Sequence, residues 1–343
     1  MESGDEKLMS TPTPRLTGSE IGYLWTGYMI DDMSQCVLGV FEQQAGDPDV
    51  LRSIALALNL ARSNNQERTA LLTGEGFPLP RGFAESDCAA SLPALFGERF
   101  FLYYLLLGAR LGLHFYAESL SVSIRQDVRS FCAERLSAAS RLYGEILDTM
   151  LSKGLYIRPP VIPVPEAPEQ IQKPSFLQGW FGDTRPLHSV EIANVYKGME
   201  LAGLIHAICT AFAQTMERKD LQSLCTQGAQ TAVEHLERLG GLLERDDLPL
   251  PPSLLSDVSG SQTPLFSERL MLCHISGLFG SLITHYGQAL GSAMKHDVVA
   301  AFLALIAGAG NYTEDVTEAL IRNEWLEKTP GALDRESLLE HPK

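Results

Sequence analysis

The sequence predicts an all-α protein made of two tandem four-helix bundles, and three observations carry this prediction. The chain has 343 residues, about twice the usual length of one domain. Short motifs recur at a nearly constant spacing along its whole length. Apolar residues recur every three or four positions, and no stretch shows the sustained alternation that a half-buried strand requires.

The repeat is clearest at two proline-rich turns. FPLP at positions 77–80 is matched by LPLP at positions 248–251, 171 residues further along the chain. Beyond these turns the spacing becomes 170 residues, which corresponds to a deletion of one residue. The matched pairs include Glu20 and Glu191, Gly27 and Gly198, Leu95 and Leu265, and Phe96 and Phe266. Matches that keep this spacing, with a single one-residue shift, over the whole length of the chain indicate a tandem duplication.

Each unit is expected to contain four long helices. A helix over 19–44 begins at the capping box that Thr17 and Glu20 form. The other helices of the first unit are expected over 48–73, 98–125 and 127–153, and Gly154 stops the last one. The second unit repeats the pattern at 189–216, 218–245, 268–295 and 297–327.

The connections between these helices predict the topology. Short turns make the first two helices antiparallel, and likewise the last two, while the long connection between the pairs can span the bundle. This up-down-down-up order with one crossover is typical of ferritin-like bundles. We expect bundles over 14–157 and 187–330, joined by a Pro-rich linker over 158–186. The aromatic segment Phe176–Phe181 is expected to pack against one or both bundles.

Composition excludes several classes of protein. With 27 basic and 42 acidic residues the net charge is −15, which disfavours nucleic acid and anionic membranes as partners. The most apolar stretch, 100–116, is interrupted by Arg110 and His114 and is too short for a membrane span, so a buried helix is expected. The N-terminal residues lack the pattern of a secretory signal peptide, and six cysteines without a CxxC pair predict reduced thiols and a cytoplasmic protein.

A ferritin-like bundle raises the question of a di-metal centre, which needs two Glu-x-x-His motifs and two further Glu residues. None of the eight histidines has a glutamate three positions before it, so the standard site is absent and no metal or other cofactor is predicted. Glu20 and Glu191 lie in first helical turns, where capping is expected instead of ligation.

A non-standard metal site in the second unit stays open. Its candidates are His206, His235, His274 and His285. His274 and His285 are about 16 Å apart along one helix, too far to share a metal without the other two. Their first-unit counterparts are Gln35, Asn64, Tyr104 and Phe115, so the set is not shared. We expect these histidines to be hydrogen-bonded or at the surface.

Other polar groups are interpreted structurally. The pairs Asp31-Asp32 and Asp246-Asp247 are expected to be solvated or to cap helices. Arg110 and His114, one turn apart on an apolar helix, predict a buried polar network with Glu118 or with a carboxylate on another helix. The alternative for these two is a small-molecule pocket between helices. Phosphate-loop, dinucleotide and nucleophile-elbow motifs are missing, so no catalytic or cofactor-binding residue is predicted.

Several motifs resemble an uncharacterised family of duplicated ferritin-like proteins from spore-forming bacteria. They are LTGSEIGYLWTGYMIDD, EGFPLPRGF, SKGLYIRPPVIPVP and SFLQGWFGDTRPLHSVEI, and the likeness covers about residues 14–335. The resemblance implies the bundle fold and a spore-coat-like setting, and it brings no catalytic residues.

These observations lead to two main functional hypotheses. The first is a non-enzymatic structural or interaction protein, cytoplasmic or spore-associated, that forms homo-oligomers or joins other coat proteins through apolar patches or the linker around Trp180. The second is a ligand-binding or degenerate metal-binding bundle that uses polar groups between its helices. An oxidase-like enzyme is a weaker third option, because the Glu-x-x-His motifs are missing.

Overall fold

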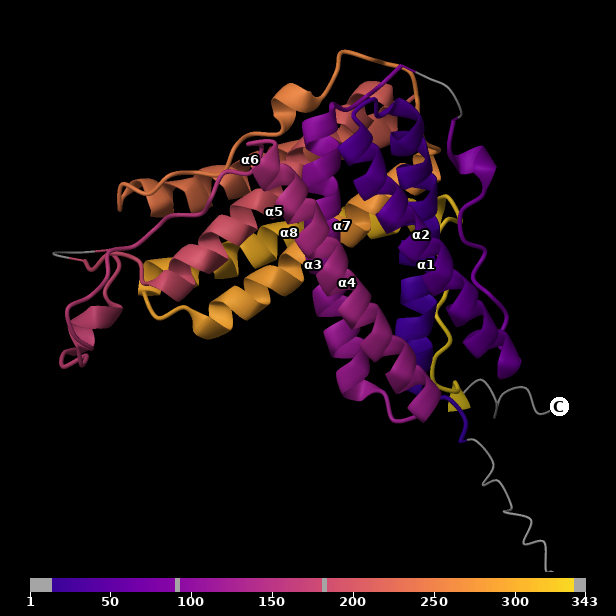
Figure 1. Ribbon diagram of the computed structural model, residues 1–343, viewed down its shortest axis with the longest axis horizontal. Helices are drawn as coiled ribbons and strands as arrows, with labels where there is room; N and C mark the ends of the chain where they lie inside the picture. Colours follow the sequence, from indigo (N-terminus) through magenta and orange to yellow (C-terminus); the bar gives the residue numbers. More distant parts are fainter. Residues whose placement is uncertain (1–13, 90–92, 181–183, 336–343) are drawn as a thin grey trace, which may run out of the picture.

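The computed structural model describes residues 14–89, 93–180 and 184–335, and in this part the chain is helical apart from two isolated β-bridges. The residues outside it include the start of the N-terminal segment, Phe181 and His341. The long helices are α1 (Gly18–Gln44), α2 (Pro48–Gly74), α3 (Glu98–Val122), α4 (Gln126–Ser152), α5 (Ser189–Thr215), α6 (Lys219–Glu244), α7 (Glu268–Ser292) and α8 (His296–Arg322). They form two four-helix units, α1–α4 and α5–α8, inclined to each other (Figure 1), which confirms the predicted class.

The helix starts agree with the prediction to within one residue, but α3, α7 and α8 end earlier than expected. The cause in α3 is Glu20, whose carboxylate accepts hydrogen bonds from the backbone N–H groups of Ile124 (2.9 Å) and Arg125 (2.8 Å). In the second unit Glu191 accepts the equivalent bonds from Met294 and Lys295. These amides therefore belong to a tight turn and not to the preceding helix.

The capping role predicted for the two glutamates is confirmed. Thr17 and Glu20 form a capping box at the start of α1, and His188 and Glu191 form the equivalent box at the start of α5. Arg185 adds a two-pronged ion pair to Glu191 at 2.7 and 2.9 Å. Burial opposes ionisation, yet the bonds from Arg185 and the backbone lower the pKa of Glu191 to about 2.

Contacts at the two ends of the first unit establish its topology. Glu98, at the start of α3, accepts hydrogen bonds from the N–H groups of Gly46 (2.6 Å) and Asp47 (2.7 Å), just before α2. At the other end Arg125, just before α4, pairs with Glu75, just after α2, at 2.5 Å. Helices α2 and α3 therefore run parallel, and the unit has the predicted up-down-down-up order.

Among the helices of the described residues, one is long and apolar enough to cross a membrane by length and composition alone, and this helix is α3. In the structure it is a bundle helix, and half of its most apolar window is buried. Phe101 of α3 stacks on Phe41 of α1, with ring centroids 4.4 Å apart. Its apolar surface is therefore used in packing against its own unit.

The Pro-rich linker contains a short 3₁₀ turn, Pro174–Leu177, and contacts the second unit as predicted. The guanidinium of Arg185 lies over the Phe176 ring at 4.1 Å, and Trp180 stacks on His296, the first residue of α8, at 6.2 Å. Trp180 nevertheless stays 58% exposed. The linker therefore lies on the second unit without being enclosed by it.

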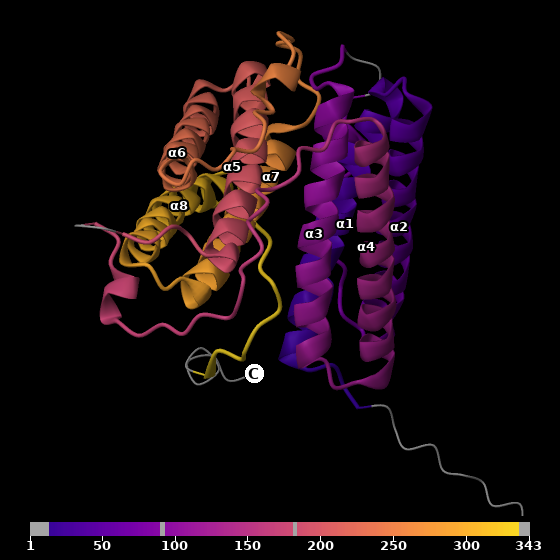
Figure 2. The ribbon, with the colours of Figure 1, turned by 60° about the vertical axis from the view of Figure 1, so that its left-hand side comes forward.

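The two units are related by an approximate twofold axis, because the contacts between their crossover segments occur in pairs with the roles exchanged. Arg99 pairs with Asp257 at 2.6 Å, and the equivalent Arg269 lies 3.8 Å from Asp87. The matching backbone bonds run from Ala89 to Leu265 and from Ser259 to Leu95, both 2.8 Å, and from Gly97 to Asp257 (2.8 Å) and from Ser267 to Asp87 (2.9 Å). Such reciprocal contacts are typical of a symmetric dimer, here formed within one chain. In Figure 2 the loops that carry these contacts meet at one end of the two bundles.

Candidate functional site

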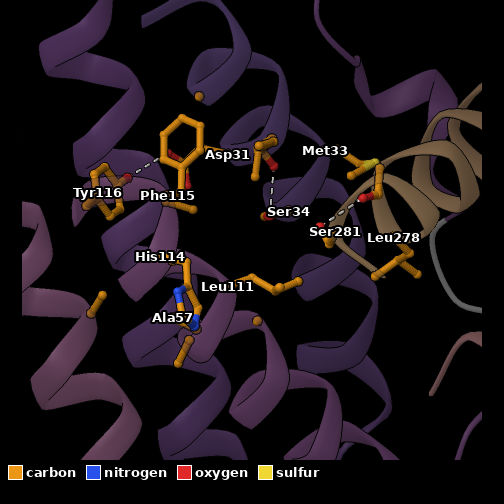
Figure 3. A pocket seen from close by; sticks show the side chains of 18 of the residues that line it. Asp31, Met33, Ser34, Ala57, Leu111, His114, Phe115, Tyr116, Leu278 and Ser281 are labelled. Atoms are coloured by element: carbon orange, nitrogen blue, oxygen red, sulfur yellow. Dashed lines mark hydrogen bonds between the residues drawn. The ribbon is translucent and has the colours of Figure 1, made fainter. Parts of the chain in front are cut away.

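A cavity of about 390 Å³ lies where the two units face each other. Its walls come from α1, α2 and α3 of the first unit, with part of α4, and from α5 and α7 of the second unit. In Figure 3 Met33 and Ser34 of α1 lie on the same side of the cavity as Leu278 and Ser281 of α7. The volume is within the usual range of small-molecule sites. Several wall residues are small, namely Ala57, Ala61, Gly108, Gly112 and Gly277.

One wall of the cavity is a buried polar network at the centre of the first unit. Arg68 of α2 is only 1% exposed and forms an ion pair with Asp31 of α1. Tyr116 of α3 accepts hydrogen bonds from Arg68 Nη2 and Asn64 Nδ2, both at 2.8 Å. Gly27 makes room for this arrangement, because a Cβ there would lie 2.6 Å from the guanidinium. The charge pair therefore occupies the middle of this bundle.

The expectation that Asp31 and Asp32 are solvated or capping residues is wrong. Asp31 is buried, because it lies on the inner face of α1, and its burial raises the pKa of the carboxyl while Arg68 opposes that rise. Asp32 accepts a hydrogen bond from the Phe83 N–H at 2.5 Å and so holds the crossover segment against α1. In the second pair Asp247 is exposed, as expected, whereas Asp246 is half-buried and accepts the Leu187 N–H at 2.6 Å at the end of the linker.

The centre of the second unit is built differently. The positions equivalent to Asp31 and Arg68 carry Ala202 and Leu239. In place of the ion pair, His235 Nδ1 lies 3.1 Å from the Tyr286 hydroxyl. The duplication therefore kept the tyrosine and replaced its charged partners with one neutral hydrogen bond.

The four histidines considered for a metal site are dispersed. His274 Nε2 contacts the Tyr104 hydroxyl of the other unit at 3.1 Å, and His285 Nε2 lies 2.9 Å from the Asn194 carbonyl. Burial lowers the pKa of His235, His274 and His285 to about 4, so each is neutral at pH 7, and it also lowers the pKa of His206. Nowhere in the described ranges do three His, Cys, Asp or Glu side chains converge as a metal site requires.

The buried polar network predicted at Arg110 is present and joins the two units, whereas His114 is exposed. Arg110 Nη1 pairs with Glu200 of α5 at 2.5 Å, and Arg110 Nη2 donates a hydrogen bond to the Tyr156 hydroxyl. Its partner is therefore a carboxylate on another helix and not Glu118. His114 Nε2 lies 2.9 Å from Lys197 Nζ of α5, and both residues line the cavity. The network and the pocket, which the sequence left as alternatives, are adjacent.

Three buried polar atoms in the cavity wall have no hydrogen-bond partner among the described residues. They are Arg68 Nε, Asn64 Oδ1 and His274 Nδ1. Their residues are at most 4% exposed. An unpaired buried donor or acceptor costs about 1–3 kcal/mol, and these three atoms are enclosed by the protein and are not exposed to the open space of the cavity.

Two functional residues were not identified from the sequence. Arg68 follows Ile54, Leu58 and Ala61 at helical spacing, so its place on an apolar face was a usable signal. Lys197 had no such signal, because its partner His114 lies in the other unit.

Comparison with solved structures finds a similarity to a protein from Bacillus halodurans C-125 that is described as a "putative spore coat protein". The two chains are 23% identical over 44% of this chain and 98% of that one, with a TM-score of 0.42. A comparison with curated proteins finds no match. A family model described as "Protein of unknown function" matches the chain twice, over residues 7–167 and 175–338. These two matches span both units, and the chain therefore belongs to the DUF3231 family, with two copies of its domain.

Proposed function

We propose that this is a non-enzymatic binding protein that holds one small, mostly apolar molecule in the cavity between its two units. The observation that carries the proposal is the cavity of about 390 Å³, with its mostly apolar walls and a few polar lining residues such as Lys197 and His114. Such a combination of an apolar volume and a few polar groups is typical of ligand sites.

The small wall residues support this function. A side chain added at Gly108 or Gly277 would meet no atom within 4 Å, so larger residues could fill part of the space. The cavity is partly open to solvent, and apolar wall that stays exposed there loses about 25 cal/mol for each Å² that packing would have buried. A chain that needed only stability would gain by filling it.

The charges around the cavity support a binding role over a catalytic one. Asp31 is held in an ion pair with Arg68, and Glu200 in one with Arg110. His274 and His285 each hold a hydrogen bond to a protein group. These side chains are positioned by structural contacts and are not arranged around a common reacting point.

The experiment compares the wild type with two glycine variants. Gly108→Leu fills the cavity, whereas Gly144→Leu makes the same change on α4, away from the lining residues, where a Cβ also meets nothing within 4 Å. The neutral dye N-phenylnaphthylamine is expected to fluoresce with the wild type and with Gly144→Leu, and to lose its signal with Gly108→Leu. Equal signals from both variants, or none from the wild type, would contradict the proposal.

A second candidate is assembly, as expected for a structural protein of the spore coat. It is favoured by apolar side chains that the linker exposes, among them Val161 (89%), Val164 (93%) and Ile171 (61%). Such side chains are typical of surfaces that bind another protein. The test is light scattering of the wild type and of Val161→Ser/Val164→Ser, together with fractionation of spores. A monomer that is missing from the spore fraction would argue against this candidate.

A further inference from the structure

We infer that the occupant of the cavity is an amphipathic monocarboxylate whose apolar chain lies between α3 and α7 and whose carboxylate meets Lys197, His114 and His285. This inference rests on the binding function proposed above and names the class of ligand.

The basic cluster at the cavity consists of Lys197, His114 and His285, and all three residues line it. Lys197 Nζ lies 2.9 Å from His114 Nε2 and forms no ion pair with any carboxylate of the described residues. Burial and the charge of Lys197 lower the pKa of His114, although Glu118 opposes this, and burial, Lys197 and His114 lower the pKa of His285. Three nitrogen groups therefore line one cavity, and the ammonium group among them has no ion-pair partner in the described part of the chain.

Of the carboxylates nearby, Glu118 also lines the cavity, yet none among the described residues forms an ion pair with Lys197. Glu200 is paired with Arg110 at 2.5 Å, and Asp31 is paired with Arg68. Glu118, one turn beyond His114, is exposed to solvent. Lys197 is half-buried, and burial together with Arg110 lowers its pKa, which means that its charge is incompletely compensated. A bound carboxylate would supply the missing charge and accept hydrogen bonds from the ammonium group.

The shape of the cavity fits an extended chain. Its wall on α3 runs from Tyr104, which contacts His274, past His114 to Glu118, and the part between Tyr104 and His114 corresponds to about 15 Å of helix. The side chains between these ends are apolar, including Leu111 of α3, Leu201 of α5 and Leu278 of α7. A polar head at the basic cluster and an apolar tail toward Tyr104 would therefore meet matching surfaces.

The basic cluster exists on one side of the approximate twofold axis. The positions equivalent to Lys197, His114 and His285 carry Thr26, Thr284 and Phe115. The two units thus provide one head-group site per chain instead of two.

The test is calorimetric titration of the full chain at pH 7 with decanoate and with 1-decanol, which share the tail and differ in the head. The wild type is expected to bind decanoate at least about tenfold more tightly, because a charged hydrogen-bonded contact is lost with the alcohol. Lys197→Met removes the cation and should bring the two affinities together, whereas Lys197→Arg should keep the preference. Lys219→Met, on the exposed start of α6, is the matched control and should behave as the wild type.

Equal affinities of the wild type for acid and alcohol, or an unchanged preference in Lys197→Met, would overturn the inference. If Gly108→Leu then abolishes both bindings, the cavity function itself stands. Binding of the neutral dye by a wild type that binds neither decanoate nor decanol overturns the ligand class alone. Failure of all three probes overturns both proposals.

Discussion

Replacing Arg68 by methionine is expected to destabilise the first unit strongly, because it leaves a buried carboxylate without its cation. Arg68 is 1% exposed and Asp31 is 9% exposed, so water does not reach the pair freely. Removing one partner of a buried ion pair costs about 3–5 kcal/mol. Asn64 and Tyr116 would remain close to Asp31, at 3.3 and 3.4 Å, and these long bonds compensate little. We therefore expect a loss of about 3–4 kcal/mol at pH 7.

The loss should depend on pH in a defined direction. Burial already raises the pKa of Asp31, and without Arg68 nothing of comparable strength opposes that rise. The native variant then binds a proton at a pH where the unfolded chain, with an ordinary carboxyl pKa of about 4, does not. The deficit of Arg68→Met is therefore expected to shrink as the pH falls from 7 toward 5.

Urea unfolding followed by circular dichroism measures both effects. The double variant Asp31→Leu/Arg68→Met removes both charges and should recover most of the stability that the single variant loses. A loss below about 1 kcal/mol at pH 7, a deficit that grows on acidification, or a double variant no more stable than the single one would refute the reasoning.

Three further predictions concern other buried groups. The wild type should lose stability as the pH falls from 6.5 toward 4, by up to about 3 kcal/mol for each of His235, His274 and His285, because these histidines are protonated in the unfolded chain but stay neutral in the native protein. His274→Phe should therefore flatten the pH profile of the melting temperature, and an unchanged profile would contradict this prediction. Glu191→Gln should cost about 3 kcal/mol in urea unfolding, since it breaks a buried ion pair and two turn bonds, and a loss below 1 kcal/mol would count against that role. Asp257→Ala should increase hydrogen exchange at the contact between the units while the helix cores keep their protection, and uniform protection would count against the reciprocal contact.

Much of the fold could be predicted because its signals are local. The capping box at Glu20 and the stop at Gly154 lie within a few residues of the helix ends that they determine. What the sequence could not show is the second role of Glu20, because its partner turn at Ile124 is 104 residues away. The early end of α3 follows from this long-range contact, and the early end of α7 follows from the equivalent contacts of Glu191.

The candidate site was less predictable for the same reason. Arg110 and His114 stood out because charged groups on an apolar helix need partners. Their partners, Glu200 and Lys197, lie on α5, 90 residues beyond Arg110 and 83 residues beyond His114 in the sequence. The cavity itself arises from small side chains on helices of both units, and this becomes visible only when the units are packed together.

The approximate twofold axis has a consequence for stoichiometry and dilution. In a dimer of identical chains, every feature beside the axis must occur twice, and the pairing weakens as the protein is diluted. Here the Pro-rich linker keeps the second unit at a high effective concentration near the first, so a modest contact between them persists at any dilution. Because the two copies are encoded separately, Lys197 could appear opposite His114 without appearing at Thr26. The two copies are therefore free to differ beside the axis, and the basic cluster at Lys197 occurs once per chain.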